Sequence, residues 1–260
     1  MLFDEFKNKQ EANMLPLELN YPFNLYTQVL AKAGISLYAL HFGLMQSDND
    51  FVEGQQRLEQ QILRALGTAT DNTRRVLQID AGLATLAPQI AQAGFDYTGL
   101  VVGGQQAEYC QQQQPQLKWS STPFLEWDES QTFDKVVLLE SAQRFEPNML
   151  LAKLTALLAD GGQAVIAETV TAELLESLPA KLASLNARIL AKQDLSEQII
   201  PSLDYLLELL YQHRNFLLKT EKVSQIKLSQ LLHRIETSRQ QLLDKKQIYL
   251  LASLGFDKIH

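Results

Sequence analysis

The sequence predicts an α/β fold in which helices cover both faces of a mainly parallel sheet. Between residues 67 and 200, short apolar segments alternate with helical ones, an order typical of βαβ units. The strand candidate 135–140 (KVVLLE) is apolar at every inner position, as burial on both faces of a sheet requires. With 46% hydrophobic and 20% charged residues, the 260-residue chain can build a full core.

The elements of this core follow one another with short connections. The strand candidates are 75–80, 97–102, 118–120, 135–140 and 162–168, and the helix candidates are 83–93, 105–113 and 147–159. Around them we expect four regions: an N-terminal arm and helical cap (1–66), the Rossmann-like core (67–200), a helical hairpin (201–246), and a last strand with a tail (247–260).

The helical regions are amphipathic. Residues 53–66 form one predicted helix, and two more in 201–246 carry apolar stripes at helical spacing, namely Leu203, Leu206, Leu207, Leu210 and then Leu228, Leu231, Leu232, Ile235. Burial against the sheet is the default interpretation of these stripes. The alternative is an interface for a second copy of the chain, as a homodimer, or for another protein, as a heteromer.

The charge balance limits the classes of partner. The formal net charge is −7 and the pI is about 5.2, whereas binding of nucleic-acid phosphates needs a basic face. No Cys/His pattern has zinc spacing, so we expect no metal site. The single cysteine, Cys110, cannot form an internal disulfide and has no activating neighbour in the sequence, which fits a reduced cytoplasm and an inert thiol.

The chain also lacks the signals of export and of membrane insertion. Residues 1–10 are charged and contain no signal-peptide apolar stretch. The longest apolar stretches fall short of the roughly 20 residues needed to cross a bilayer. We therefore expect a cytoplasmic protein without a membrane span.

Several segments resemble the class I methyltransferases that use S-adenosylmethionine (SAM). Segment 76–85 (VLQIDAGLAT) occupies the place of their glycine motif, whose pattern is V-L-D-I-G-C-G-T-G-G. Segments 94–101, 133–140 and 157–162 are similar to the second-strand, fourth-strand and fifth-strand motifs. Upstream, His41-Phe42-Gly43-Leu44 resembles the cap of small-molecule methyltransferases related to cyclopropane fatty acid synthases, and Gln193-Asp194-Leu195-Ser196 with Pro201 matches their sixth-strand exit. The resemblance, over about 38–254, implies a seven-stranded sheet with a reversed last strand.

The departures from the glycine motif concern the residues that would bind the cofactor. Glycines there let the backbone approach the ligand. Only Gly82 remains, whereas Asp80 and Ala84 stand where the family has its first and third glycines, and Gln78 replaces the motif's carboxylate.

The positions expected to hold the adenosyl group are also changed. The resemblance places the ribose-binding carboxylate at Val101 or Val102 and the adenine-binding acid near Ser121 and Thr122. None of these side chains is acidic. Each lost charge-assisted hydrogen bond is worth roughly 1.5–3 kcal/mol, so two or three losses would weaken SAM binding by about two to five decades.

Two acidic residues allow alternative interpretations. Asp80 could attract the cofactor's sulfonium or ammonium; the alternative is that it caps the predicted helix 83–93. A carboxylate there would also repel the cofactor's own carboxylate, by about 4 kcal/mol at 4 Å and an effective dielectric near 20. Glu140 ends a strong strand at its carboxyl end, where it lines the ligand pocket or caps the next turn.

Candidate catalytic residues are few. His41 could act as a general base over a methyl acceptor, or be a packed, hydrogen-bonded histidine. Tyr205, Tyr211 and His213 on the C-terminal hairpin are candidates for a substrate lid, and Tyr205 is a second catalytic candidate, although core packing also explains the tyrosines.

Two functions follow from these observations. The losses at Gln78, Asp80, Ala84 and Val101 predict a pseudo-methyltransferase that has lost productive SAM binding and acts as a binding or scaffolding subunit. The retained cap around His41 and the intact fourth-strand motif favour the alternative, an active small-molecule methyltransferase with an unusual SAM site. Its catalysis would come mainly from alignment of the acceptor, without metal.

Overall fold

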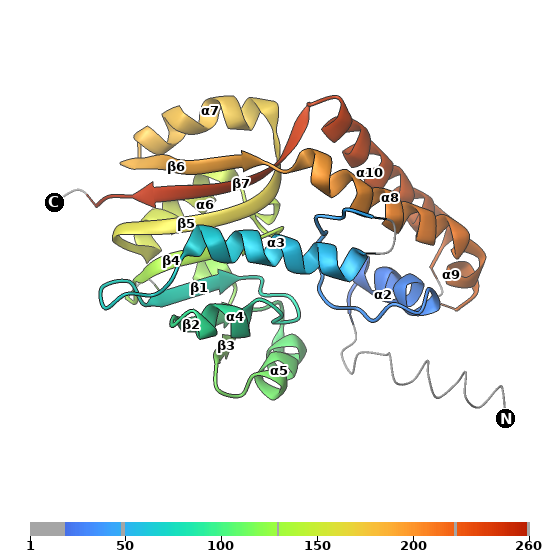
Figure 1. Ribbon diagram of the computed structural model, residues 1–260, viewed down its shortest axis with the longest axis horizontal. Helices are drawn as coiled ribbons and strands as arrows, with labels where there is room; N and C mark the ends of the chain where they lie inside the picture. The colour runs from blue at the N-terminus through green and yellow to red at the C-terminus, as the bar shows by residue number, and fades with distance from the viewer. Residues whose placement is uncertain (1–18, 48–49, 129, 221–222, 259–260) are drawn as a thin grey trace.

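One seven-stranded sheet runs through the centre of the molecule (Figure 1). The computed structural model describes residues 19–47, 50–128, 130–220 and 223–258. The strand order is β3-β2-β1-β4-β5-β7-β6, and β7 alone runs antiparallel to its neighbours. The strands are β1 (Arg75–Ile79), β2 (Asp96–Leu100), β3 (Lys118–Ser120), β4 (Phe133–Leu139), β5 (Leu158–Thr171), β6 (Ala187–Asp194) and β7 (Gln247–Phe256). The predicted α/β class and the reversed last strand are confirmed.

Helices cover both faces of this sheet and enclose two apolar cores. On one face lie α3 (Phe51–Leu66), α4 (Ala87–Gln92) and α5 (Gly104–Gln113). The other face is covered by α6 (Pro147–Leu157), α7 (Ala172–Ala183) and the short 3-10 helix η1 (Phe124–Glu126). A second 3-10 helix, η2 (Ala142–Arg144), follows β4. The inner strands alternate their side chains between the two cores, which explains their continuous apolar sequences.

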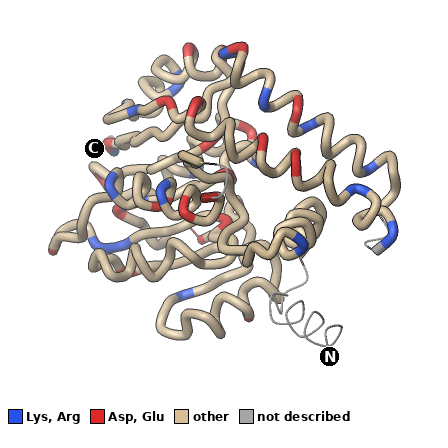
Figure 2. The backbone as a smooth tube through the Cα atoms, turned by 45° about the vertical axis from the view of Figure 1, so that its right-hand side comes forward, with Lys and Arg blue, Asp and Glu red and all other residues tan. Residues whose placement is uncertain are grey.

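The remaining helices gather beyond the carboxyl ends of the parallel strands (Figure 1). They are α2 (Phe23–Lys32), α8 (Ser196–Gln212), α9 (Arg214–Thr220) and α10 (Gln225–Leu243). The leucine stripes of α8 and α10 are buried in the first core, so the default interpretation of these stripes holds. Charged residues of both signs occur along these helices (Figure 2).

Two predicted helix boundaries are wrong. The predicted helix 83–93 begins only at Ala87, because residues 82–86 form turns and bends with left-handed backbone at Gly82 and Ala84. The C-terminal helices begin at Ser196, so Pro201 lies inside α8 instead of before it. The predicted arm is described only from residue 19 onward, and its first 18 residues lie outside the described part of the chain. Within the described ranges, no helix has the length and apolar character needed to cross a bilayer.

The cap segment is held on α3 at a close contact between Gly43 of the cap and Gly54 of α3. Leu44 N donates to the carbonyl oxygen of Gly54 over 2.9 Å, and Gly43 N donates to Ser202 Oγ over 3.1 Å. A Cβ atom on Gly43 would lie 2.5 Å from the backbone nitrogen of Gln55, well inside van der Waals contact. Only glycine lets the segment that carries His41 approach α3 this closely.

This close contact predicts that Gly43→Ala lowers the free energy of unfolding by about 3 kcal/mol, because backbone atoms must separate. Urea denaturation measures the change. Gly104→Ala is the control, since an added Cβ there meets nothing within 4 Å, and it should be neutral or slightly stabilising. A Gly43→Ala protein as stable as the parent would contradict the close contact described here.

Candidate functional site

A cleft of about 960 Å³ opens at the carboxyl ends of β1, β2 and β4. Ligands of open α/β sheets bind at this edge. The walls come from the cap (residues 19–23 and 39–41), the loop after β1 (residues 80–86), the N-terminus of α5, the end of β4 with η2, and Arg234 of α10. Parts of the chain that are distant in sequence therefore build one site.

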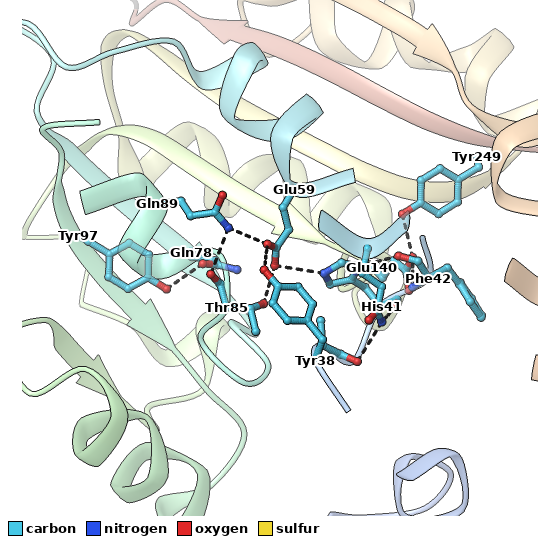
Figure 3. A network of polar contacts seen from close by, with 12 residues as sticks. Tyr38, His41, Phe42, Glu59, Gln78, Thr85, Gln89, Tyr97, Glu140 and Tyr249 are labelled. Carbon is cyan, nitrogen blue, oxygen red and sulfur yellow. Dashed lines mark hydrogen bonds and ion pairs between the residues drawn. The ribbon is translucent and has the colours of Figure 1, made fainter. Parts of the chain in front are cut away.

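The carboxylate of Glu59 holds the inner side of this cleft together (Figure 3). Glu59 projects from α3, is fully buried, and accepts four hydrogen bonds. Its Oε2 accepts from Tyr38 Oη (2.6 Å) and Gln89 Nε2 (2.7 Å). Its Oε1 accepts from Thr85 Oγ1 (2.5 Å) and lies 3.4 Å from His41 Nε2. One side chain thus joins α3, the cap, the loop after β1 and α4.

The network shifts the pKa values of Glu59 and His41 in opposite directions. Burial alone would raise the pKa of Glu59, but hydrogen bonds from His41, Thr85 and Tyr38 outweigh it and hold that pKa below its usual value. Burial would lower the pKa of His41, yet Glu59 and the charge of Glu140 raise it instead. The imidazole Nδ1 also donates to the carbonyl oxygen of Phe42 over 2.7 Å. With Nδ1 and Nε2 both engaged, His41 has no free nitrogen to act as a base.

Glu140 forms a second polar centre of the cleft. Its Oε1 accepts from the backbone N–H of Phe42 (3.0 Å) and from Tyr249 Oη (2.8 Å), as Figure 3 shows. Burial raises the pKa of Glu140. Behind it lies Glu168, 2% exposed, whose pKa is raised to about 7 by burial and by the charge of Glu140. The backbone of Glu140 has a φ of 51°, a costly conformation for a residue with a side chain.

The loop after β1 keeps a left-handed backbone at alternate residues. Asp80, Gly82 and Ala84 have φ values of 52°, 58° and 65°, although only one of them is a glycine. Such a conformation costs an alanine about 1 kcal/mol. Asp80 caps no helix, which corrects one of its two interpretations: α4 begins at Ala87, and the Asp80 carboxylate pairs instead with Arg144 Nη1 at 2.7 Å.

Glutamine side chains occupy the space between β1 and β2. Gln78 Oε1 accepts from Tyr97 Oη over 2.8 Å. Gln106, on α5, accepts from the backbone N–H of Val102 and donates to the carbonyl oxygen of Gly82. Gln106 thereby bridges the loop after β1 and the end of β2.

Comparison with solved structures identifies this architecture. The [4+2]-cyclase SpnF matches with a TM-score of 0.72 at 17% identity, over 96% of this chain and 97% of its own. The cyclopropane synthase MmaA2 from Mycobacterium tuberculosis matches with a TM-score of 0.68 at 14% identity, over 83% of this chain and 89% of that one. A geranyl diphosphate methyltransferase matches with a TM-score of 0.64 at 13% identity, over 97% of this chain and 98% of that one. The chain has the class I methyltransferase fold.

At these identities the likeness establishes the fold alone. No protein-family model and no curated protein sequence matches the chain. The fold expected from segments 76–85 and 133–140 is thus confirmed by the sheet order and by these structures.

The structure brings most of the predicted site residues together. The cleft is lined by His41, Gln78, Asp80, Gly82, Val102 and Glu140. Of the two positions considered for a ribose contact, Val102 lines the cleft at 46% exposed, whereas Val101 is buried in the first core.

Three other candidates lie away from the cleft surface. Ala84 is buried in the core beneath the loop after β1, and Thr122 is exposed beside β3, where its N–H binds Ser120 Oγ. Tyr205 stacks on Phe51 with ring centroids 5.5 Å apart. Tyr205 is therefore a packing residue, as its alternative interpretation held, and the structure gives it no catalytic position.

The sequence analysis missed the residue on which the site is centred. Glu59 shares the apolar face of α3 with Leu58 and Ile62. A carboxylate on an apolar stripe is seldom fully buried unless it is paired, and that signal could have found it. Arg144 and Tyr249 carry no comparable signal, because only the tertiary structure brings Arg144 to the cleft and Tyr249 to Glu140.

The buried position of Cys110 agrees with the inert thiol expected for it. Cys110 is buried, its thiol donates to the carbonyl oxygen of Gly82 over 3.7 Å, and burial raises its pKa to about 12. It is therefore a poor nucleophile. No cluster of three metal-ligating side chains occurs within the described ranges.

Replacing Glu59 by glutamine should destabilise the protein. The glutamine amide has the same shape as the carboxylate, but an NH2 group replaces one acceptor oxygen. That NH2 group would then face two other hydrogen-bond donors. We expect Glu59→Gln to lower the free energy of unfolding by about 2–4 kcal/mol in urea denaturation. Glu53→Gln, on the exposed side of the same helix, should change it by less than about 0.5 kcal/mol. Equal stability of the two variants would rule out Glu59 as the centre of the network.

Glu168 should make stability depend on pH. Its pKa is about 7 in the folded protein, against an ordinary value of 4.5. The folded state therefore keeps a proton that the unfolded chain releases between these values, and the free energy of unfolding falls as pH rises from about 4.5 to 7. The contribution is at most about 3 kcal/mol.

We expect Glu168→Gln to remove this part of the pH dependence, measured by urea denaturation at a series of pH values. Glu176→Gln, an exposed carboxylate on α7, should leave the wild-type slope unchanged. A wild-type slope retained in Glu168→Gln would show that the buried carboxylate is not its source.

Proposed function

We propose that this protein is a pseudo-methyltransferase, which binds a small molecule in its cleft and does not transfer a methyl group from SAM. The observation that carries the proposal is the position of Gln106. Its amide occupies both the N–H of Val102 and the carbonyl oxygen of Gly82. The resemblance assigns this space, between the glycine loop and the end of the second strand, to the ribose of the cofactor.

The charges around the loop after β1 support the same proposal. The carboxylate of Asp80 stands beside this loop and is paired with Arg144. Burial raises the pKa of Asp80 in spite of Arg144, so a further carboxylate placed nearby would meet an environment that already disfavours negative charge. Val102 offers no hydrogen-bond acceptor for ribose hydroxyls. The residues present therefore do not fit SAM, and we assign no reaction step to it.

The comparisons are compatible with a function other than methylation. One similar structure is a [4+2]-cyclase, whereas others are a methyltransferase and a cyclopropane synthase. A fold of this kind carries several chemistries, and function is decided by the site. This supports assigning the function from the side chains of the cleft.

One observation favours the alternative, an active methyltransferase with an atypical SAM site. The loop keeps left-handed backbone at residues 80, 82 and 84, so its shape has been retained despite the lost glycines. In that case His41 would not be the base, because its pKa is raised and both of its nitrogens are engaged. Alignment of the acceptor would supply most of the catalysis.

Calorimetric titration with SAM and with S-adenosylhomocysteine tests the proposal. We expect no binding at millimolar ligand, because the contacts that would give micromolar affinity are missing. A micromolar dissociation constant for either compound would overturn the proposed function and establish the alternative.

A double variant tests whether the eroded site has been placed correctly. Asp80→Gly with Val102→Asp frees the loop and restores a carboxylate beside the cleft, so it should gain at least about tenfold in affinity for S-adenosylhomocysteine. Asp80→Gly with Val102→Asn is the matched control without the charge and should gain less. No gain in either variant would show that the adenosyl site is misplaced.

A further inference from the structure

Glu140 has one carboxylate oxygen free at the inner end of the cleft. Both of its hydrogen bonds, from Phe42 N and Tyr249 Oη, go to Oε1. Within the described residues, no donor contacts Oε2, and this atom is not among the buried unpaired ones. Glu140 lines the cleft, so Oε2 is open to it. A carboxylate fixed through one oxygen presents the other in a defined direction.

Gln78 offers a complementary group in the same cleft. It is only 3% exposed, and its Oε1 is taken by Tyr97. Its Nε2 donates to no group in the described part of the chain, and Figure 3 shows this nitrogen turned away from Tyr97. This donor is therefore free to bind a hydrogen-bond acceptor in the cleft.

The charges of the inner cleft favour a cation beside Glu140. Glu140 interacts electrostatically with His41 and with Glu168, while Glu59 contacts His41, so three carboxylates share this region with one imidazole. His41 is already engaged by Glu59, and Arg144 is engaged by Asp80. Burial, and then the charge of Glu140, raises the pKa of Glu168. A positive group against Oε2 would relieve both carboxylates, whereas an anion would add to the repulsion.

We propose that the cleft binds a small molecule through a protonated amine on Glu140 and through a hydroxyl or carbonyl oxygen on Gln78. Ala39, Leu40 and Leu139, which line the same cleft, provide an apolar wall for the carbon chain between the two groups. This inference rests on the proposed function, because it names the class of ligand that the same cleft would hold.

Three matched probes test the inference by calorimetry or ligand-observed NMR. Aminohexanol, hexanediol and hydroxyhexanoate share one chain with a hydroxyl at one end, and differ only in carrying an amine, a hydroxyl or a carboxylate at the other. We expect aminohexanol to bind at least about tenfold more tightly than hexanediol, because a charge-assisted hydrogen bond replaces a neutral one. Hydroxyhexanoate should bind most weakly.

Two variants separate the contributions of the two groups. Glu140→Gln can still accept from Phe42 and Tyr249 through its Oε1, so it should fold, and it should reduce aminohexanol binding to the level of hexanediol. Gln78→Leu should weaken aminohexanol and hexanediol by a similar factor. Glu126→Gln, an exposed change on η1, is the control and should bind all three probes like the parent protein.

Three outcomes would overturn the inference. They are absence of binding by all three probes, unchanged aminohexanol affinity in folded Glu140→Gln, and tightest binding by hydroxyhexanoate. The last result would instead indicate anion recognition by Arg234 at the cleft wall. Titration with SAM is independent of these results. Tight SAM binding would overturn the proposed function, whereas only the probe series tests whether Glu140 binds a protonated amine.

Discussion

The arrangement of this molecule around its cleft depends on one buried carboxylate. Glu59 accepts hydrogen bonds from the cap, from the loop after β1 and from α4, while it is itself carried by α3. A buried charge is stable only when such donors surround it. Conversely, Tyr38, Thr85 and Gln89 keep their positions because their polar atoms must find an acceptor. Sheet and cap are thereby coupled at the point where a ligand would enter.

In the loop after β1, the backbone conformation and the side chains point to different conclusions. Its left-handed positions persist at Asp80 and Ala84, where glycine would be less strained. The surrounding contacts maintain this shape: Ala81 N binds the carbonyl oxygen of Leu100, and Gln106 binds that of Gly82. The side chains, in contrast, differ from those of a nucleotide-binding loop. The backbone shape of this loop therefore does not depend on one set of side chains, and the fold by itself does not decide the activity.

The second carboxylate centre has a different character from the first. All the hydrogen-bonding capacity of Glu59 is used inside the protein, so it is structural. Glu140 has one oxygen without a partner among the described residues, and burial together with the charge of Glu140 raises the pKa of Glu168. Carboxyl groups with shifted pKa values beside an open cleft are more often found at binding sites than in structural cores. Glu59 and Glu140 are the same residue type, but they differ in how many of their acceptor positions are occupied by protein donors. This difference assigns a structural role to Glu59 and a ligand-facing role to Glu140.

By itself, the sequence determined the local elements and their order. Apolar segments such as 135–140 and the leucine stripes of 201–246 specified strands and helices, because burial on two faces gives a continuous apolar segment and burial along one stripe gives a periodic pattern. It also indicated Gln78, Asp80 and Glu140 as residues of one crevice. The tertiary structure alone decided that Arg144 neutralises Asp80, that Tyr205 packs on Phe51, and that Glu59 joins four segments. Those facts depend on pairings between residues distant in sequence, and a pairing of that kind leaves no periodic trace in the chain.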